Sequence, residues 1–515
     1  MIVWVDPVLS GSLCSGAVQV EVSRGQGRPV YEQIAAQLRA AIESGEVGAG
    51  QRLPTIRALA QRLGVNRDTV ALAYDALSAE GLIESGVGRG TFVAQQAAAG
   101  DGDAAAAERG ARFEPLLSPL TARLLAFERA RPRFGSDAGP VPMHALIPDP
   151  SLYPVGEFRR ALSRVLREDG ASLLAYGGPE GHPAMRQLQA ERLRLAGIDV
   201  SAEEVVLCHG ASQGITLVLR LFAEPGDVVA LEEPTYNNVL ASVFGLGLRT
   251  APVPLREDGP DLAVLERTLA RPEVKAFYTI PSFHNPTGAT TSLAARRALL
   301  AVAARCGKPI IEDGYELDLA WLGHAPQPLA ALDRSGLVVH LSSYSKSLFP
   351  GARVGSIAAR GALVEGLHAQ KRATDHSDAM CLQAALAELV SSGAYDRHLA
   401  RLLPVLRARC EALVEALAAE MPEGTRFTRP EGGLQVWVEL PGDLDTHELL
   451  ADAARAGVLF APGAQFHHDG RRSRALRLCF ALPDVDAIRR GVALLGKVVE
   501  ARLGAEPRTR ASVHI

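Results

Sequence analysis

The sequence predicts a two-part protein, in which a small helical domain with a terminal hairpin precedes a larger α/β domain with a mostly parallel sheet. Residues 28–93 have helical periodicity and end in a glycine-rich hairpin. Residues 94–139 begin with AQQAAAGDGDAAAAERGAR, which has almost no large apolar side chain and is typical of a linker. From residue 140 to 505, apolar runs such as EVVLCHG and DVVALEEPTY alternate with helical segments. This alternation is typical of buried parallel strands covered by helices.

Composition restricts the class of protein. With 515 residues, 47% hydrophobic and 22% charged, the chain can fold into two or three globular domains. The net charge of −4 gives no electrostatic indication of nucleic acid or membrane. The six cysteines form no CxxC pair, which argues against a disulfide framework and a zinc site and suits a reducing cytoplasm. From the cysteine pattern we expect a cytoplasmic protein without a metal. No run approaches 18 apolar residues, so we expect no membrane span.

The two ends of the chain are expected to lie outside the folded domains. Residues 1–27 begin with MIVWVDPVLSGSLCSG, which is apolar and ends in small residues as a signal peptide does. However, it carries an aspartate and no basic residue, and Pro7 interrupts the apolar run. We therefore expect either a flexible, dispensable leader over 1–27 or residues that lie upstream of the true start codon. A C-terminal tail is expected over 506–515.

Residues 28–93 predict a helix-turn-helix with a wing. In the first helix, apolar residues recur every four positions: Val30, Ile34, Leu38 and Ile42. The segment TIRALAQRLGV predicts a second helix that ends at Gly64, and Asn66 is a suitable N-cap for a third helix over NRDTVALAYDALSAEGL. Two short helices joined by a tight glycine turn are typical of the helix-turn-helix, whose second helix enters the major groove. LIESGVGRGTFV then predicts a hairpin, the wing.

Six residues of this domain are candidates for DNA contact. The first turn of the third helix can reach base edges or phosphates, two arginines on the second helix and the wing can reach the backbone, and a glycine allows close approach. These candidates are Asn66, Arg67, Thr69, Arg57, Arg89 and Gly90. Seven arginines are balanced by seven acidic residues in 28–93, so a docking module with solvated arginines is the alternative.

The whole block from RPVYEQ to GRGTFV resembles the winged-helix domain of GntR-type bacterial regulators. The matching landmarks are the opening Pro-x-Tyr, LPTIRALA, GVNRDTV and the terminal Gly-x-Gly-Thr-Phe-Val. This resemblance implies binding to double-stranded operator DNA. The sequence departs from some members at Ala71, where they carry a further basic residue.

One lysine in the larger domain stands out. The chain has five lysines against 49 arginines, and Lys346 lies in SSYSKSLFPGARVG, surrounded by hydroxyl groups. Lysine can form an imine with a carbonyl cofactor, whereas arginine cannot. Arg353 lies close along the chain and is expected to lower the pKa of Lys346. This pattern indicates pyridoxal phosphate.

Other residues fit the remaining requirements of that cofactor, although each has an ordinary structural explanation. Residues 210–213 form a strand-to-helix turn that can bind phosphate, and Asp313 ends a buried strand where a pyridinium would compensate its charge. Tyr315 lies two residues beyond it. A common βα turn, a helix cap, turn chemistry at Asn285 and packing at Tyr236 are the alternatives. Arg477 alternates with apolar residues in LRLCF, so it is either a surface charge or an inward carboxylate ligand.

Together, over roughly residues 140–500, these segments resemble the fold-type I aminotransferases. The matching motifs are YGGPEGHPAMR, HGASQG, EEPTY, FHNPTG, EDGYEL, SYSKSLFPGARVG and LRLCF. The resemblance implies an internal aldimine on Lys346, Asp313 at the pyridine nitrogen, and Arg477 on the carboxylate of an amino acid. It implies that the ring is held by Asn285, Tyr315 and Tyr236, and the phosphate by Ala211, Ser212, Gln213, Ser343, Arg353 and the partner subunit's Tyr176.

A GntR-type winged helix, a linker and an aminotransferase-like domain, in this order, resemble the MocR-type regulators. The resemblance implies a head-to-tail homodimer that regulates transcription. The pairing of the two sets of motifs leads to the hypothesis that an amino acid or amine is sensed by displacing Lys346 from the cofactor as an external aldimine, with its carboxylate on Arg477. Two alternatives remain. The first is a catalytically active aminotransferase that also binds DNA. The second is a regulator that senses pyridoxal phosphate itself and controls vitamin B6 synthesis.

Overall fold

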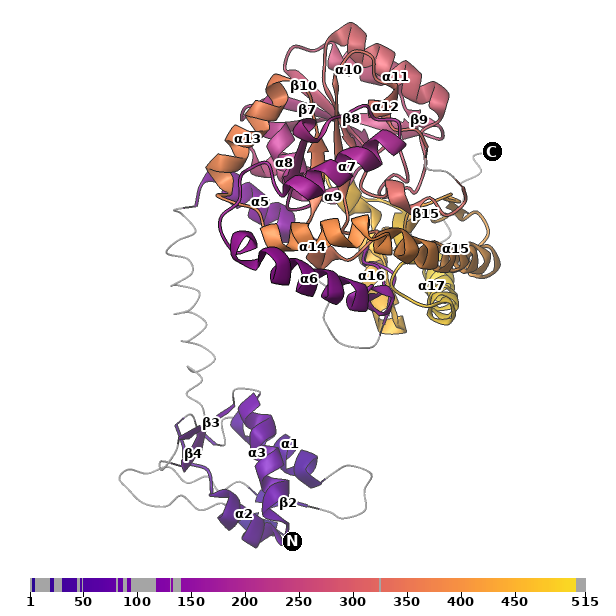
Figure 1. Ribbon diagram of the computed structural model, residues 1–515. Helices are drawn as coiled ribbons and strands as arrows, with labels where there is room; N and C mark the ends of the chain where they lie inside the picture. The colour runs from indigo at the N-terminus through magenta and orange to yellow at the C-terminus, as the bar shows by residue number, and fades with distance from the viewer. Residues whose placement is uncertain are drawn as a thin grey trace, which may run out of the picture. The chain divides into compact units, whose positions relative to one another are not determined.

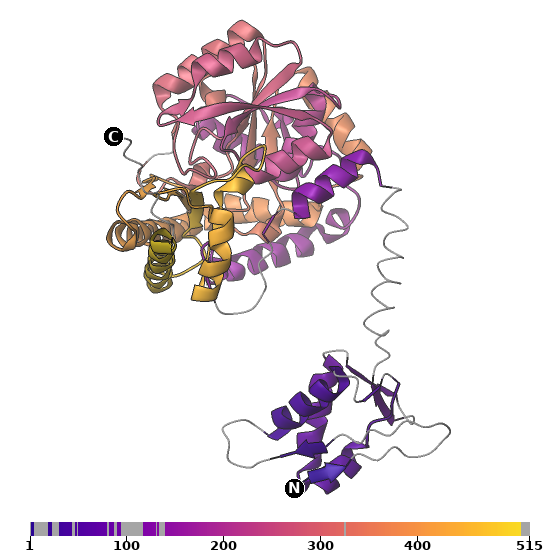
Figure 2. The ribbon, with the colours of Figure 1, turned by 180° about the vertical axis from the view of Figure 1, so that it is seen from behind.

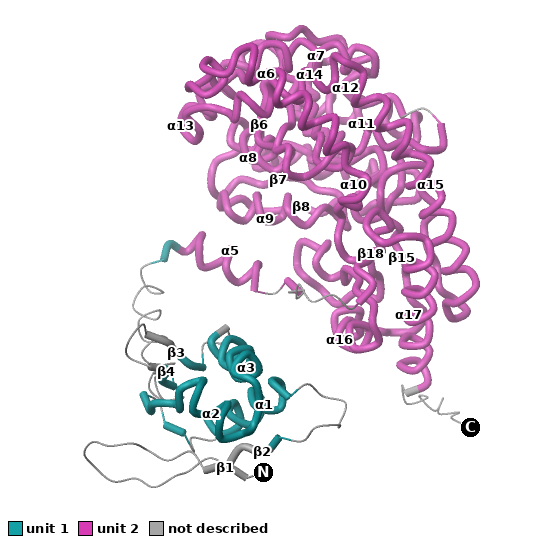
Figure 3. Tube along the Cα trace, turned by 60° about the horizontal axis from the view of Figure 1, so that its bottom comes forward, with its two compact units in different colours: residues 1–118 teal, residues 119–515 magenta. Residues whose placement is uncertain are grey.

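The computed structural model describes residues 2–4, 19–22, 30–43, 47–48, 50–79, 82–86, 90–93, 117–129, 131–132, 140–323 and 326–505. The chain divides into two compact units, residues 1–118 and 119–515, which Figure 3 distinguishes by colour. None of the described helices is long and apolar enough to cross a membrane.

The described residues of the first unit include three helices and a hairpin: α1 (Val30–Glu43), α2 (Ile56–Leu63), α3 (Arg67–Ala79), β3 (Ile83–Gly86) and β4 (Gly90–Val93). Its core gathers Ile34 and Leu38 of α1, Leu59 of α2, and Val70 and Leu77 of α3. β3 and β4 pair antiparallel. The helix-turn-helix and hairpin predicted from the sequence are therefore present.

The turn between α2 and α3 follows from local chemistry. Thr55 caps α2, because its hydroxyl accepts a hydrogen bond from the amide of Ala58 at 3.2 Å. α2 ends at Gly64, which has φ +63°, a left-handed conformation that glycine adopts without a steric cost. Asn66 then accepts a hydrogen bond from the amide of Asp68 at 3.3 Å, which starts α3 in its new direction.

Two segments differ from the expected leader and linker. β1 (Ile2–Trp4) pairs antiparallel with β2 (Gln19–Glu21), so the predicted leader contains regular structure. Within the predicted linker, α5 (Pro119–Arg129) is a helix of the second unit. Residues 94–116, and the tail over 506–515, lie outside the described residues.

An eight-stranded sheet organises the second unit, in the order β6-β13-β12-β11-β10-β7-β8-β9. β12, β11, β10, β7 and β8 run parallel, whereas β13 is antiparallel to β12 and β6, and β9 is antiparallel to β8. The strands are β6 (Val205–Cys208), β7 (Val228–Glu233), β8 (Arg249–Arg256), β9 (Gly259–Pro260), β10 (Val274–Thr279), β11 (Ile310–Asp313), β12 (Val338–Ser343) and β13 (Gly355–Ala358).

Helices cover both faces of this sheet, as Figure 2 shows from behind. One layer buries Val229 and Leu231 of β7 and consists of α8 (Ala211–Phe222), α9 (Asn237–Gly245) and α13 (Ala362–Thr374). The opposite layer buries Val228 and Ala230 and consists of α10 (Leu262–Leu269), α11 (Leu293–Cys306) and α12 (Leu329–Leu332). Burial on both faces explains why these strands are continuous apolar runs. α6 (Val155–Leu173), α7 (Pro183–Leu195) and α14 (Met380–Ser391) pack beside the sheet.

The C-terminal residues form a smaller subdomain, coloured orange to yellow in Figure 1. It contains α15 (Ala394–Glu420), α16 (Thr446–Ala456), α17 (Val485–Ala505) and a four-stranded sheet in the order β14-β15-β18-β17. Its strands are β14 (Arg426–Phe427), β15 (Gln435–Glu439), β17 (Ala461–Pro462) and β18 (Ala475–Cys479). A short parallel pair joins β5 (Val141–Pro142) to β16 (Val458–Leu459), so the start of the second unit reaches this subdomain.

Candidate cofactor site and nucleic-acid interface

The first turn of α3 presents the DNA-contact candidates that lie within the described residues. Asn66 and Arg67 are exposed, as is Arg57 on α2, and Thr69 is half-buried. Gly90 begins β4, whereas Arg89 lies outside the described residues. The buried residues of α3, Val70, Tyr74 and Leu77, occupy its opposite face, so the polar residues of the first turn are free to meet a ligand.

In the second unit, Lys346 opens into a cavity of about 200 Å³. Nine of the residues predicted for the cofactor line it: Ala211, Ser212, Tyr236, Asn285, Asp313, Tyr315, Ser343, Lys346 and Arg353. They come from the carboxyl ends of several strands and the turns that follow, the usual position of ligands in parallel α/β sheets. Leu146, Asn238, Ser345 and Pro350 complete the wall, and they were not predicted from the sequence.

Lys346 follows β12 and is half-buried. Its Nζ donates a hydrogen bond to the carbonyl oxygen of Leu146 at 2.5 Å. Burial lowers the pKa of Lys346, the carboxyl of Glu316 opposes that change, and the nearby charges of Arg477 and Arg353 lower it further. The predicted effect of Arg353 is therefore present, but burial is the larger cause. A lowered pKa is what a lysine needs to act as an amine nucleophile.

Asp313 ends β11, where it is buried. Its Oδ2 accepts a hydrogen bond from the hydroxyl of Tyr278 at 2.7 Å. Its other oxygen, Oδ1, is buried without a hydrogen-bond partner of ordinary length among the described residues. Burial raises the pKa of Asp313 to about 6. A buried carboxylate oxygen without a donor favours a cationic N–H group as its ligand.

The N-terminus of α8 faces the same cavity. Gly210 precedes it with φ +84°, and Ala211 and Ser212 form its first turn, whose backbone amides can bind an anion. Arg353 lies against Gly210 and donates a hydrogen bond to the carbonyl of His209. The strand bearing Gly355 approaches closely, since a Cβ at that position would lie 2.7 Å from the carbonyl oxygen of Ser342 and 2.9 Å from the Cα of Gly210. This packing places a guanidinium and a helix N-terminus at one end of the cavity.

Arg477 is not a surface charge, which was one of the two interpretations left open by the sequence. It lies on β18, and only 6% of its surface is exposed, so it is an inward residue. Its Nη1 donates to Oδ1 of Asn285 at 2.9 Å and its Nη2 to the carbonyl of His144 at 2.8 Å. Its Nε is buried without a partner among the described residues. Arg477 therefore lies behind Asn285, beside the cavity, with unused donor capacity.

Three buried polar residues near the lysine were missed by sequence reasoning. Gln435 donates from Nε2 towards the hydroxyl of Tyr315 at 3.4 Å and Oε2 of Glu316 at 3.3 Å. Burial raises the pKa of Glu316 to about 8. Tyr278 belongs to β10, whose parallel register places it opposite Ile311, two residues before Asp313. The contact of Tyr278 with Asp313 depends on this pairing register, which the sequence alone does not predict.

Two predicted cofactor residues do not reach the cavity within this chain. Gln213 accepts a hydrogen bond from the amide of His209 at 2.7 Å and donates to Asp375, so its side chain turns away. Tyr176 is 83% exposed and contacts His376 edge-on.

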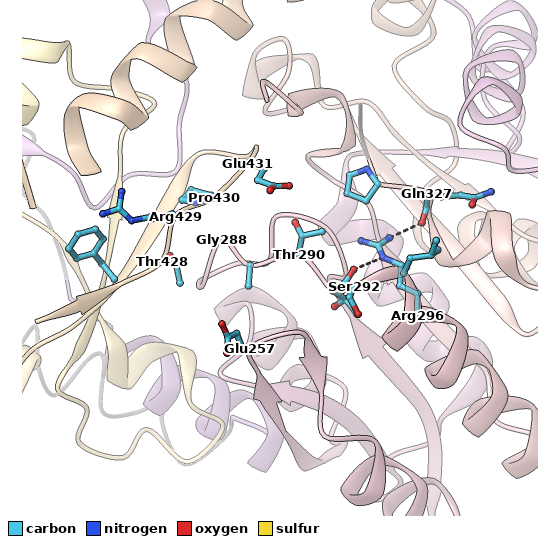
Figure 4. A pocket seen from close by; sticks show the side chains of 15 residues that line it. Glu257, Gly288, Thr290, Ser292, Arg296, Gln327, Thr428, Arg429, Pro430 and Glu431 are labelled. Atoms are coloured by element: carbon cyan, nitrogen blue, oxygen red, sulfur yellow. Dashed lines mark hydrogen bonds between the residues drawn. The ribbon is translucent and has the colours of Figure 1, made fainter. Parts of the chain in front are cut away.

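A larger groove, of about 820 Å³, lies elsewhere in the second unit, between residues 288–296 and 427–431 (Figure 4). Its buried cation is Arg296, whose guanidinium donates to the carbonyls of Thr291, Gln327 and Pro281 and to the hydroxyl of Ser282. These donors are used to hold the loop, and no catalytic group predicted from the sequence lies there. The smaller lysine cavity is therefore the candidate site.

Each of the two units matches a known protein family. Residues 30–93 match the family described as bacterial regulatory proteins, gntR family, and residues 149–495 match aminotransferase class I and II. The probable rhizopine catabolism regulatory protein MocR of Rhizobium meliloti is 30% identical over 488 residues, which are 94% of this chain and 97% of that protein. The chain belongs to the MocR-type regulators.

Enzymes resemble the second unit of this MocR-type chain as well. The 2-aminoadipate transaminase of Thermus thermophilus is 37% identical over 361 residues, 69% of this chain and 89% of that protein. The crystal structure of LysN, the α-aminoadipate aminotransferase of the same species, has a TM-score of 0.70 at 33% identity and covers 76% of this chain and 99% of that one. The cofactor of this fold is pyridoxal phosphate. The lysine, the unpaired oxygen of Asp313 and the N-terminus of α8 fit its aldehyde, pyridine nitrogen and phosphate.

Proposed function

We propose that this MocR-type regulator binds operator DNA through α3 and the wing, and that a small amino acid or amine in the lysine cavity changes that binding. One observation carries the proposal: a chain with a GntR-type winged helix also holds a lysine of lowered pKa in a cavity with buried Arg477 beside it. Bound pyridoxal phosphate would supply a carbonyl with which amines react. Such a protein would act in the cytoplasm, where DNA is.

Each residue has a proposed role in holding the cofactor. Lys346 would provide the amine that binds the aldehyde, and Asp313 would accept a hydrogen bond from the protonated pyridine nitrogen. Tyr236 lies on the ring face, and Asn285 and Tyr315 bind the ring hydroxyl. Ala211, Ser212, Ser343 and Arg353 bind the phosphate. Gln213 contributes indirectly, because it fixes the turn at His209.

Arg477 is proposed to bind the carboxylate of the effector. Its Nε is unused, and its Nη1 bond to Asn285 links it to a residue that lines the cavity. Rigid paired donors of arginine match a carboxylate better than a lysine does. Burial would strengthen this interaction, because the guanidinium is already removed from water.

We further propose a head-to-tail homodimer in which Tyr176 reaches the phosphate of the partner subunit. The support is its position on an exposed loop, where a large aromatic side chain is 83% accessible in the single chain. Replacing Tyr176 by phenylalanine should weaken cofactor binding only in the dimer. Cofactor binding is measured at protein concentrations above and below the dimer dissociation constant, and sedimentation shows whether the protein is a dimer or a monomer at each concentration.

The effector can be found by titrating the cofactor-loaded protein with amino acids and following the visible spectrum of the cofactor. The first compounds are L-2-aminoadipate and L-leucine, because the LysN relative is described with phosphopyridoxyl-leucine and acts on aminoadipate. Compounds that change the spectrum are then tested for a change in affinity for DNA upstream of the gene, at one fixed salt concentration. No change in DNA affinity with any spectrally active compound would contradict sensing of an amine.

A second candidate is catalytic transamination, which the 37% identity with a transaminase and the nine gathered cavity residues favour. With a second keto acid supplied to accept the amino group, release of more than one keto-acid product per protein molecule would support it. Production limited to one equivalent would fit a receptor.

A further inference from the structure

Three consecutive residues at the start of α9 contact three different parts of the second unit. Tyr236 lines the lysine cavity, and its hydroxyl accepts a hydrogen bond from Nδ2 of Asn238 at 2.7 Å. Asn237 donates to Oε1 of Gln465 in the C-terminal subdomain at 3.2 Å. Oδ1 of Asn238 accepts a hydrogen bond from Nη2 of Arg131 at 2.8 Å. The amide of Asn238 thus joins the cavity wall to the residues that follow α5.

α5 is attached to the rest of this unit through α9 and the turn after it. Phe127 packs edge-on against Phe244 of α9, with ring centroids 5.3 Å apart. Leu120 and Leu124 lie against residues 245–247, where the glycines leave room for them. No residue of α5 is buried. A helix with so little buried apolar surface has a small free energy of docking, so one hydrogen bond is a large part of it.

The position of α5 along the chain gives this attachment its importance. The chain divides between Ser118 and Pro119, and α5 begins at Pro119. The DNA-binding unit is therefore covalently joined to the cofactor-binding unit at the N-terminus of α5. A change in the docking of α5 on α9 therefore moves the point at which the second unit is joined to the first.

We infer that Asn238 and Arg131 form a hydrogen-bonded connection that makes the seating of α5 depend on the contents of the lysine cavity. A ligand ring on Tyr236 fixes the phenol, which fixes Asn238, because turning its amide would break both hydrogen bonds. Arg131 then holds the end of α5 against α9. The two states are α5 docked and α5 released, and the ligand favours one of them. This inference rests on the proposed function, because the connection regulates only if occupancy controls DNA binding.

Arg131 is the residue to change, because it lies outside the cofactor cavity. Its Nη1 also contacts Oε1 of Glu128 at 2.8 Å, its guanidinium lies 5.6 Å from the centre of the Phe127 ring, and it borders a separate cavity of about 470 Å³. It is a positioning residue without a place in the apolar core. Arg131→Ala should remove the connection and leave a folded protein that still binds pyridoxal phosphate. Arg123→Ala is the matched control, since Arg123 is an exposed arginine within α5 itself.

Hydrogen exchange of the full-length protein, with and without pyridoxal phosphate, tests the inference. In wild-type protein we expect the cofactor to slow amide exchange in residues 119–129 by about fivefold, the ratio that modest coupling gives. Arg131→Ala should abolish this difference, although its visible spectrum shows normal cofactor uptake, and Arg123→Ala should retain it. DNA affinity should become independent of the cavity ligand only in Arg131→Ala.

The inference would be overturned if the cofactor slowed amide exchange in residues 119–129 of Arg131→Ala as much as in wild type. It would also be overturned if the cofactor bound to wild type without slowing that exchange. Loss of cofactor uptake in Arg131→Ala would also overturn it, because Arg131 would then act on the cavity itself. Wild-type protein that takes up no cofactor would instead overturn the proposed function, and the visible spectrum distinguishes that outcome from the others.

Discussion

Replacing Asp313 by asparagine separates two effects of this buried carboxylate. One is the loss in free energy of unfolding that its burial causes, and the other is its contribution to binding the cofactor. Burial raises the pKa of Asp313 from 3.8 to about 6. Between these two pH values the folded chain binds more protons at this residue than the unfolded chain, so stability falls as pH rises. The destabilisation is absent below pH 3.8 and complete above about pH 6. The pKa change corresponds to about 3 kcal/mol of unfolding free energy.

Asparagine can still accept the hydrogen bond from Tyr278 and carries no charge to bury. The second unit spans residues 119–515, and an unfolding entropy of about 2.1 cal/mol/K per residue converts about 3 kcal/mol into about 4 °C. Cofactor-free Asp313→Asn should therefore unfold about 4 °C above cofactor-free wild type at about pH 7.5, with a smaller difference at about pH 5. Pyridoxal phosphate should stabilise wild type more than the variant. Scanning calorimetry measures both, and a variant that is no more stable than wild type at the higher pH would show that the charged carboxylate of Asp313 does not destabilise the cofactor-free fold.

Three further predictions follow from the geometry. Arg67→Ala should lower DNA affinity by roughly tenfold and reduce the slope of log K against log salt by about 1 if Arg67 binds phosphate; an unchanged salt titration would contradict this. Arg477→Lys should weaken a carboxylate-bearing effector by about 10- to 100-fold in spectral titrations and leave its decarboxylated analogue unaffected. Gly355→Ala should lower the free energy of unfolding in denaturant by about 2–4 kcal/mol, because its Cβ would meet backbone atoms. Gly170→Ala in α6 is the control and should not lower it, because the space around its Cβ position is open.

The sequence predicted those parts of the site that depend on local order along the chain. Asp313 ends a buried strand, Lys346 follows another, and Ser212 lies in a strand-to-helix turn, so their place at one edge of a parallel sheet could be inferred. Tyr278 could not be, because its contact with Asp313 depends on the register between β10 and β11. The environment of Glu316 depends on Gln435 in a different subdomain, which no local pattern reveals.

The differences have physical causes as well. Gln213 lies in the predicted turn, but its side chain is taken by His209 and Asp375. α5 was included in the linker because it buries no residue, and periodicity detects a helix chiefly through its buried face. Arg477 could be placed on a strand but not on a face, since the neighbouring strands of its sheet were not predicted.

The most direct test of the account is a fluorescence titration of DNA from upstream of the gene with wild-type protein and with Lys346→Ala, at one fixed salt concentration. Each protein is measured without cofactor, with pyridoxal phosphate, and with pyridoxal phosphate plus an amine that changes its spectrum. If the lysine cavity controls DNA binding, wild-type affinity changes when the amine is added, and Lys346→Ala binds the same DNA without that response. A response to pyridoxal phosphate alone would point to cofactor sensing. Equal affinity in all three states of wild type would contradict the central claim that the lysine cavity controls DNA binding.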